Sequence, residues 1–134
     1  MAGDDDLAGT GMGFELFAAS LRADASDTVA FMEALATKVG GALPQRTRIE
    51  RDGGLFSRAH HVRRVSVRLG DWEYALAMEP GGSLTASRTH AVRGITLKSE
   101  PLPLDEWINE LSAELEELAR TSLQDQAALR RLLS

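Results

Sequence analysis

The chain has three histidines, His60, His61 and His90, and their side chains are the ones best suited to bind a metal ion. Imidazole is a common zinc ligand, so a site would form if the fold brought all three together. Adjacent residues of an extended chain point in opposite directions, however, so His60 and His61 seldom bind one ion. The chain has no cysteine, and no nearby acidic residue completes a ligand spacing. We therefore expect exposed loop histidines, with no metal site and no cofactor.

No sequence motif of a known catalytic site is present. The serines lie in no nucleophile elbow, and the HExxH, P-loop and GxGxxG motifs do not occur. The acidic residues Glu114, Glu116 and Glu117 fall on the polar side of a predicted helix, where a solvent-facing role is the more common one. We expect no catalytic residue and no enzyme. An enzyme or metal protein that uses the histidines remains the third of three hypotheses.

Arginines in the middle of the chain are the best candidates for binding. In a predicted strand, Arg64 and Arg68 fall on one face because side chains alternate. Arg88 lies on a second predicted strand, and Arg46 and Arg48 lie on a third. If these faces align, the sheet carries a basic stripe opposite its core side. Guanidinium groups bind carboxylates and phosphates well, so the stripe would suit an anionic partner.

Three interpretations of this arginine face stay open. The arginines could pair across strands with Glu50, Glu73 and Glu79. They could bind an acidic protein, including a second copy of the chain. They could also bind nucleic acid, which usually requires aromatic residues for base stacking. Here Trp72 and Tyr74 fall on the apolar side of their strand, which disfavours nucleic acid.

Charge is sorted along the chain. Residues 1–45 carry seven acidic and two basic residues, residues 46–98 five acidic and ten basic, and residues 99–134 eight acidic and three basic. The basic middle coincides with the predicted strands and the acidic ends with predicted helices. The overall net charge of −5 opposes attraction of the whole molecule to nucleic acid or to an anionic membrane.

Apolar residues supply a second set of candidate contacts. Leu55 and Phe56 follow two glycines at a predicted loop tip, where exposed apolar side chains would suit docking. Near the end of the chain, Leu129, Leu132 and Leu133 could form a helix–helix contact in a homodimer. The leucine stripe of residues 104–118 is more often core, although its length also allows such a contact.

The elements that would position these residues follow from apolar periodicity. Helices are predicted at 14–22 and 27–39, the second ended by Gly40-Gly41. Strands are predicted at 46–51, 62–69 and 72–79, and 83–98 forms either one bent strand or two short ones. A helix follows Pro103, and residues 123–133 form a last helix or extend it. We predict an α+β fold: N-terminal helices, an antiparallel meander of 4–5 strands, and C-terminal helices packed on one sheet face.

Length and composition indicate one soluble domain. A chain of 134 residues fits a single domain, which we place at 14–134 after a disordered tail at 1–13. Met12 is an alternative natural start to Met1. No stretch reaches the length of a membrane span, and the N-terminus lacks a signal-peptide pattern. Together with the lack of cysteine, this predicts a cytoplasmic protein that does not bind membranes.

Two resemblances add expectations about fold. The stretches Phe14–Asp24 and Leu102–Trp107 resemble a family of small uncharacterised actinobacterial proteins, a resemblance that implies no activity. The order of elements over Phe14–Leu118 is similar to the type III secretion chaperone-like group of YbjN-type α+β domains. Those chaperones insert a helix between their strands, and no helix is predicted within residues 46–98. No functional residue carries over from either family.

These observations favour a non-catalytic protein-interaction domain, chaperone-like or adaptor-like, that self-associates as a homodimer. The alternative is binding of nucleic acid or another polyanion through the arginine-rich sheet face. The sequence predicts the following interaction residues: Arg64, Arg68, Arg88, Leu55, Phe56, Leu129, Leu132 and Leu133.

Overall fold

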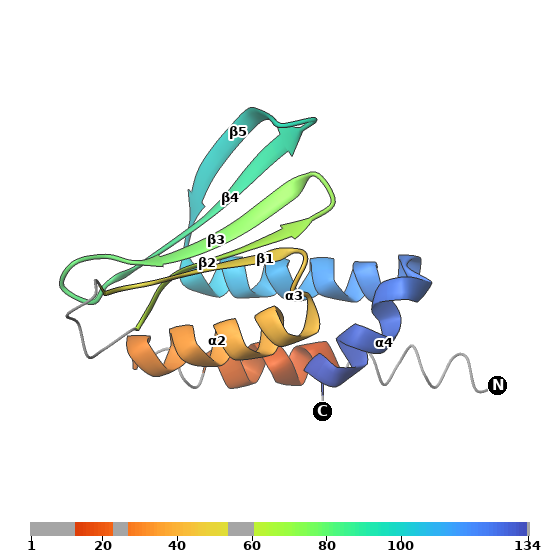
Figure 1. Ribbon diagram of the computed structural model, residues 1–134, viewed down its shortest axis with the longest axis horizontal. Helices are drawn as coiled ribbons and strands as arrows, with labels where there is room; N and C mark the ends of the chain where they lie inside the picture. Colours follow the sequence, from red (N-terminus) through yellow and green to blue (C-terminus); the bar gives the residue numbers. More distant parts are fainter. Residues whose placement is uncertain (1–12, 23–26, 54–60, 134) are drawn as a thin grey trace.

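The computed structural model describes residues 13–22, 27–53 and 61–133. Two N-terminal helices, at 13–22 and α2 (Thr28–Ala42), precede a five-stranded sheet, and α3 (Leu104–Thr121) and α4 (Leu123–Leu132) follow it. The strands are β1 (Thr47–Arg51), β2 (Val62–Leu69), β3 (Trp72–Met78), β4 (Leu84–Val92) and β5 (Ile95–Leu102). They pair antiparallel in chain order. Figure 1 shows the helices on one side of the sheet. The predicted α+β fold is confirmed.

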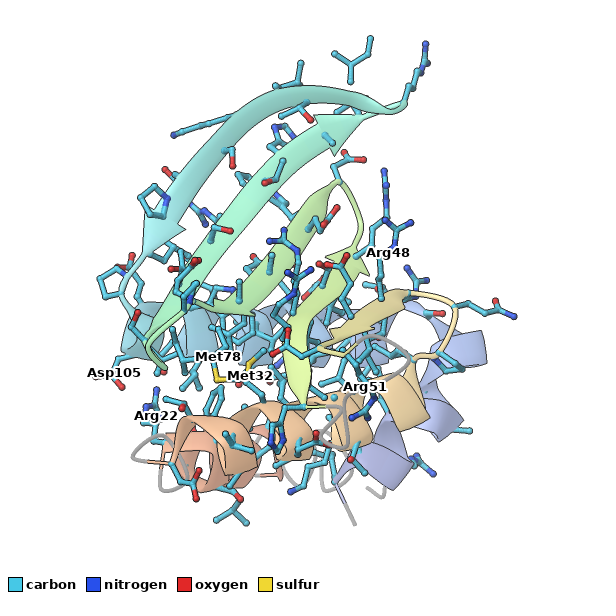
Figure 2. The ribbon with its side chains drawn as sticks, turned by 60° about the vertical axis from the view of Figure 1, so that its left-hand side comes forward. Arg22, Met32, Arg48, Arg51, Met78 and Asp105 are labelled. Atoms are coloured by element: carbon cyan, nitrogen blue, oxygen red, sulfur yellow. The ribbon has the colours of Figure 1, made fainter. Side chains whose placement is uncertain are left out.

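Strand periodicity is confirmed in the centre of the sheet. Val65, Val67 and Leu69 are buried on the helix side of β2, and Tyr74 and Leu76 of β3 lie beside them. We call this side the inner face and the opposite, helix-free side the outer face. Inner-face side chains meet α2 directly, and Figure 2 shows Met32 of α2 and Met78 of β3 close together between helix and sheet.

The segment at residues 83–98 forms two strands, which settles the alternative that the sequence left open. Arg93 and Gly94 form the turn between β4 and β5, with φ angles of 54° and 81°. A two-residue turn with both φ angles positive matches the twist of the strands that it joins. Gly94 is thus part of the hairpin turn, and residues on either side of it can pair with each other.

Helix α2 does not end at Gly40-Gly41, as predicted, but continues to Ala42. Neither glycine has a positive φ angle, so neither acts as a left-handed cap. A Cβ atom on Gly40 would lie only 2.8 Å from Ile49 Cδ1. Gly40 therefore allows α2 to pack closely on β1, and this packing explains a glycine inside the helix.

Helix α3 buries the predicted stripe against the sheet. Ile108, Leu111 and Leu115 are fully buried, as is Trp107, whose Nε1 donates a hydrogen bond to the Ser87 carbonyl at 3.0 Å. This bond joins α3 to β4. The prediction that α3 packs on one sheet face is confirmed.

Two further helices complete the layer beneath the sheet. Ser122 has an extended conformation, so α4 is a separate helix that packs against α2 and α3. In the helix at 13–22, Phe14, Phe17 and Leu21 are buried, and Arg22 donates a hydrogen bond to Asn109 of α3. Figure 2 shows Arg22 beside Asp105, also on α3. Apart from Gly13, the predicted tail lies outside the described residues.

Candidate functional site

The register of the strands brings several arginines together on the outer face. Arg64, Ser66 and Arg68 of β2 alternate with the buried valines, so they point away from the helices. Arg48 of β1 is the register partner of Ser66 and lies on the same face. Figure 2 shows Arg48 on the side of the sheet away from α2. Ala75 of β3, the other partner of Ser66, continues this row across the sheet.

These residues line a shallow hollow of about 530 Å³, which we call the outer groove. Ser66, which lines it, is 7% exposed and the neighbouring Ala75 is 4% exposed, although no helix covers this face. Longer side chains stand around them and shield them from solvent. The lining residues are Gln45, Arg46, Thr47, Arg48, Glu50, Arg64, Ser66, Arg68 and Glu73.

The arginines of the outer groove differ in whether they already have a partner. Arg64 lies 3.7 Å from a Glu50 carboxylate oxygen, and both side chains are well exposed. Arg48 and Arg68 form no ion pair within the part of the chain that the structure describes, although Glu73 is the register partner of Arg68. The outer groove therefore presents two exposed guanidinium groups that can bind an anion.

A second hollow of about 850 Å³ adjoins the outer groove, and the two share Glu50 and Arg64. It extends past Ala77 to the turn at residues 80–82. The outer face is thus hollowed along the direction of β2 and β3. An elongated ligand fits this shape better than a compact one.

Arg88 is not part of the outer groove, contrary to the stripe that we expected from Arg64, Arg68 and Arg88. The register partner of Arg88 on β3 is Tyr74, whose side chain is buried on the inner face. Arg88 therefore lies on the opposite face of the sheet from the other two arginines. Alternation within one strand does not reveal which face a residue of another strand occupies, because cross-strand register decides it.

Arg88 has partners of its own on the inner face. Its guanidinium group donates to Glu100 of β5 at 2.5 Å and to Glu110 of α3 at 2.8 Å. It also stacks on the Trp72 ring, with its Cζ 4.6 Å from the ring centre. The hydrogen bond to Glu100 raises the pKa of Arg88, and the same bond lowers the pKa of Glu100. Arg88 thus links β4, β5 and α3 and is not free to bind a ligand.

Replacing Arg88 with methionine should lower the free energy of unfolding by about 1–2 kcal/mol, because two charge-assisted hydrogen bonds to partly exposed carboxylates are lost. Urea unfolding measures the change. The matched control is Arg64→Met, which removes one exposed ion pair at 3.7 Å and should cost less than about 0.5 kcal/mol. Equal losses for the two variants would contradict a structural role specific to Arg88.

The histidines do not gather at one place. His61 is exposed just before β2, whereas His90 lies on β4 with its ring stacked on Trp72 at 4.6 Å. Trp72 pairs with Leu69 at the far end of β2, so His61 and His90 are separated by about 20–25 Å of strand. His60 lies outside the described residues. Within residues 13–22, 27–53 and 61–133, no cluster of His, Asp or Glu could hold a metal ion.

The apolar candidates have different outcomes. Leu55 and Phe56 lie outside the described residues. Leu129 is 1% exposed and Leu132 6% exposed, and Leu133 packs against the same core. The C-terminal leucines therefore hold α4 to the rest of the monomer. Their surface is already used, so a contact with another copy requires a different part of the molecule.

The fold and the groove define a class: an α+β domain with helices on one face of an antiparallel meander and a basic, solvent-exposed opposite face. The chain matches no protein-family model, no curated protein and no solved structure. Among the described residues, no helix has both the length and the apolar character that crossing a bilayer demands.

Proposed function

We propose that this protein is a non-catalytic interaction domain, chaperone-like or adaptor-like, that binds an acidic segment of another protein in the outer groove. The observation that carries the proposal is the pair of exposed guanidinium groups on Arg48 and Arg68, which have no ion-pair partner within the described part of the chain and lie on the helix-free face. Arginine forms bidentate hydrogen bonds with carboxylates, so these residues suit glutamate or aspartate side chains.

The shape of the outer groove supports an extended polypeptide as the ligand. Ser66 has the smallest side chain among the residues that line it, and the longer charged side chains are on either side. Arg64 and Arg68 belong to β2, Arg48 belongs to β1, and Arg46 directly precedes β1. These arginines can therefore contact successive side chains of the bound segment. The adjoining hollow lengthens the surface toward the β3–β4 turn.

Nucleic acid is the less favoured anionic ligand. Single strands bind largely through stacking of bases on aromatic side chains. Trp72 and Tyr74 are both on the inner face, where Trp72 is occupied by Arg88 and His90. The net charge of −5 also opposes binding to a long polyanion. An acidic peptide segment needs no aromatic side chain for stacking. Because its contact with the protein is short, the net negative charge of the protein opposes its binding less.

The double variant Arg48→Glu/Arg68→Glu tests the proposal. An acidic peptide of alternating glutamate and alanine should bind the natural protein in a salt-dependent way, because exposed charges are screened by salt. The variant should bind at least about tenfold more weakly, because two attractive contacts become repulsive. Fluorescence anisotropy of a labelled peptide measures both affinities, and a labelled single-stranded oligonucleotide is titrated in parallel.

The matched control is Lys38→Glu/Arg130→Glu, which makes the same change in net charge at two exposed positions on the helices. It should leave peptide affinity within about twofold, because neither side chain lines the groove and both belong to the helix layer on the opposite side of the sheet. Equal weakening by both double variants, or tighter binding of the oligonucleotide than of the peptide, would contradict the proposed function.

The proposal includes the cytoplasm as the compartment, and the absence of cysteine supports it. It also includes self-association as a homodimer. Because Leu129 and Leu132 are buried within the monomer, the contact between copies must use another surface.

A further inference from the structure

The two edges of the sheet differ in length and in exposed apolar surface, although each ladder carries a register shift, which on β5 falls at Leu97. At one edge, β1 has five residues, three of them charged, and a bulge between Glu50 and Arg51, all features that discourage pairing. At the other edge, β5 has eight residues and presents the exposed apolar side chains of Ile95 and Leu97, which are 64% and 59% exposed. Figure 1 shows no described helix or strand beside the free edge of β5, and Figure 2 shows the same edge from a second direction.

The ladder determines which backbone groups of β5 face this free edge. Ala91 N–H donates to the Asp71 carbonyl, so its backbone groups point toward β3. The alternating residues Arg88 and His90 therefore point theirs toward β5, to their register partners Glu100 and Lys98. It follows that Ser99, between those partners, directs its N–H and C=O away from β4, toward solvent.

One neighbour of Ser99 also has a backbone group available at the edge. Pro101 follows the same alternation as Ser99, so its carbonyl faces solvent and the N–H that proline lacks is not needed by β4. Leu97 lies at the register shift, where Thr96 pairs with Ala91 and Lys98 with His90, so alternation does not place its backbone groups at the edge. The free edge thus offers groups from Ser99 and Pro101.

The sequence of β5 is self-complementary about Ser99. In an antiparallel pair of two copies related by a two-fold axis at Ser99, Lys98 of each copy faces Glu100 of the other, in addition to the Glu100 of its own chain, which lies 3.3 Å from Lys98 Nζ. Leu97, at the register shift, lies opposite Pro101. A shift of the axis to Lys98 or Glu100 would place like charges opposite each other, which is destabilising. Lysine at an edge normally discourages pairing, but in this register it meets a carboxylate.

We propose that β5 pairs with β5 of a second copy about Ser99, so that two sheets join into one continuous antiparallel sheet. Ser99 residues of the two copies exchange backbone hydrogen bonds, and the exposed Leu97 side chain of each copy lies beside Pro101 of the other. This surface is separate from the outer groove, so the pairing rests on the self-association part of the proposed function and is independent of peptide binding.

Two variants test this pairing in the full chain. Ser99→Pro removes an N–H that does not bond to β4, so it should prevent pairing and leave the β4–β5 hairpin intact. Lys98→Glu places like charges opposite each other twice, and should raise the dimer dissociation constant at least about tenfold. Sedimentation equilibrium over a dilution series measures the constant, and circular dichroism confirms that each variant is folded.

The matched control is Arg93→Glu, which makes the same charge change in the β4–β5 turn, beyond the register of the proposed pair. The natural protein and Arg93→Glu should both show a mass twice that of the monomer that falls on dilution. A strictly monomeric natural protein would overturn the proposal. A dimer that neither Ser99→Pro nor Lys98→Glu weakens would also overturn it.

Discussion

Replacing Trp107 with alanine is expected to lower the free energy of unfolding by about 3–5 kcal/mol, the range measured for the loss of a buried tryptophan. Trp107 has no exposed surface, and it lies where α3 meets β4. The substitution removes the indole from the core and also the hydrogen bond from Nε1 to the Ser87 carbonyl. A domain of this size has roughly 5–15 kcal/mol of stability in total, so the variant should be close to unfolding.

Trp107→Phe separates the two contributions. Phenylalanine keeps most of the buried apolar area but cannot donate to Ser87, so the expected loss is about 1–2 kcal/mol. The exposed neighbour Glu106 provides the control, because Glu106→Ala should change stability by less than about 0.5 kcal/mol. Urea unfolding followed by circular dichroism measures all three. A loss below about 1 kcal/mol for Trp107→Ala would mean that α3 does not pack on the sheet through this side chain.

Tyr74 should ionise with a pKa of about 12, well above the ordinary value of 10.0. Burial is the main cause, since it disfavours the charged phenolate, and the nearby carboxylates of Glu114 and Glu110 add to the shift. Arg88 acts in the opposite direction. Because Tyr74 is the only tyrosine of the chain, ultraviolet absorbance of tyrosinate reports on this residue alone. The titration midpoint should fall to about 10 when the protein is unfolded in denaturant.

This pKa predicts how stability changes in alkaline solution. Below pH 10 Tyr74 is neutral in both the folded and the unfolded chain, so its contribution is fully present. Between pH 10 and about pH 12 only the unfolded chain loses the proton, and stability falls by up to about 3 kcal/mol. Urea unfolding at successive pH values measures the decline. Tyr74→Phe should lack this component of the decline, and an identical pH profile for the variant would contradict the assignment.

Much of the fold could be predicted because each element carries its own local pattern. Alternation in β2 and the stripe from Leu104 to Leu118 depend on residues that are close in sequence, and both predictions were confirmed. The end of α2 was wrong because the role of Gly40 depends on Ile49, which belongs to a strand. No pattern within the helix indicates that contact.

The candidate site was only partly predictable, and for a related reason. Arg64 and Arg68 belong to one strand, so alternation places them on the same face. Arg88 was assigned to that face without knowledge of its register with Tyr74, which puts it on the other face beside Glu100 and Glu110. If the register is counted back from the β3–β4 turn, with Met78 opposite Leu84, then Arg88 falls opposite Tyr74. Counting in this way would have placed Arg88 on the correct face of the sheet.

The sequence alone determined most of the secondary structure, the antiparallel order of the strands and the basic character of the sheet, because these follow from short-range periodicity, turn residues and composition. Only the tertiary structure decided which arginines stay unpaired, that Leu129 and Leu132 are consumed in the core, and that the edge of β5 is open. The physical reason is that strand register and helix packing join residues far apart in the chain, and side-chain exposure depends on those distant neighbours.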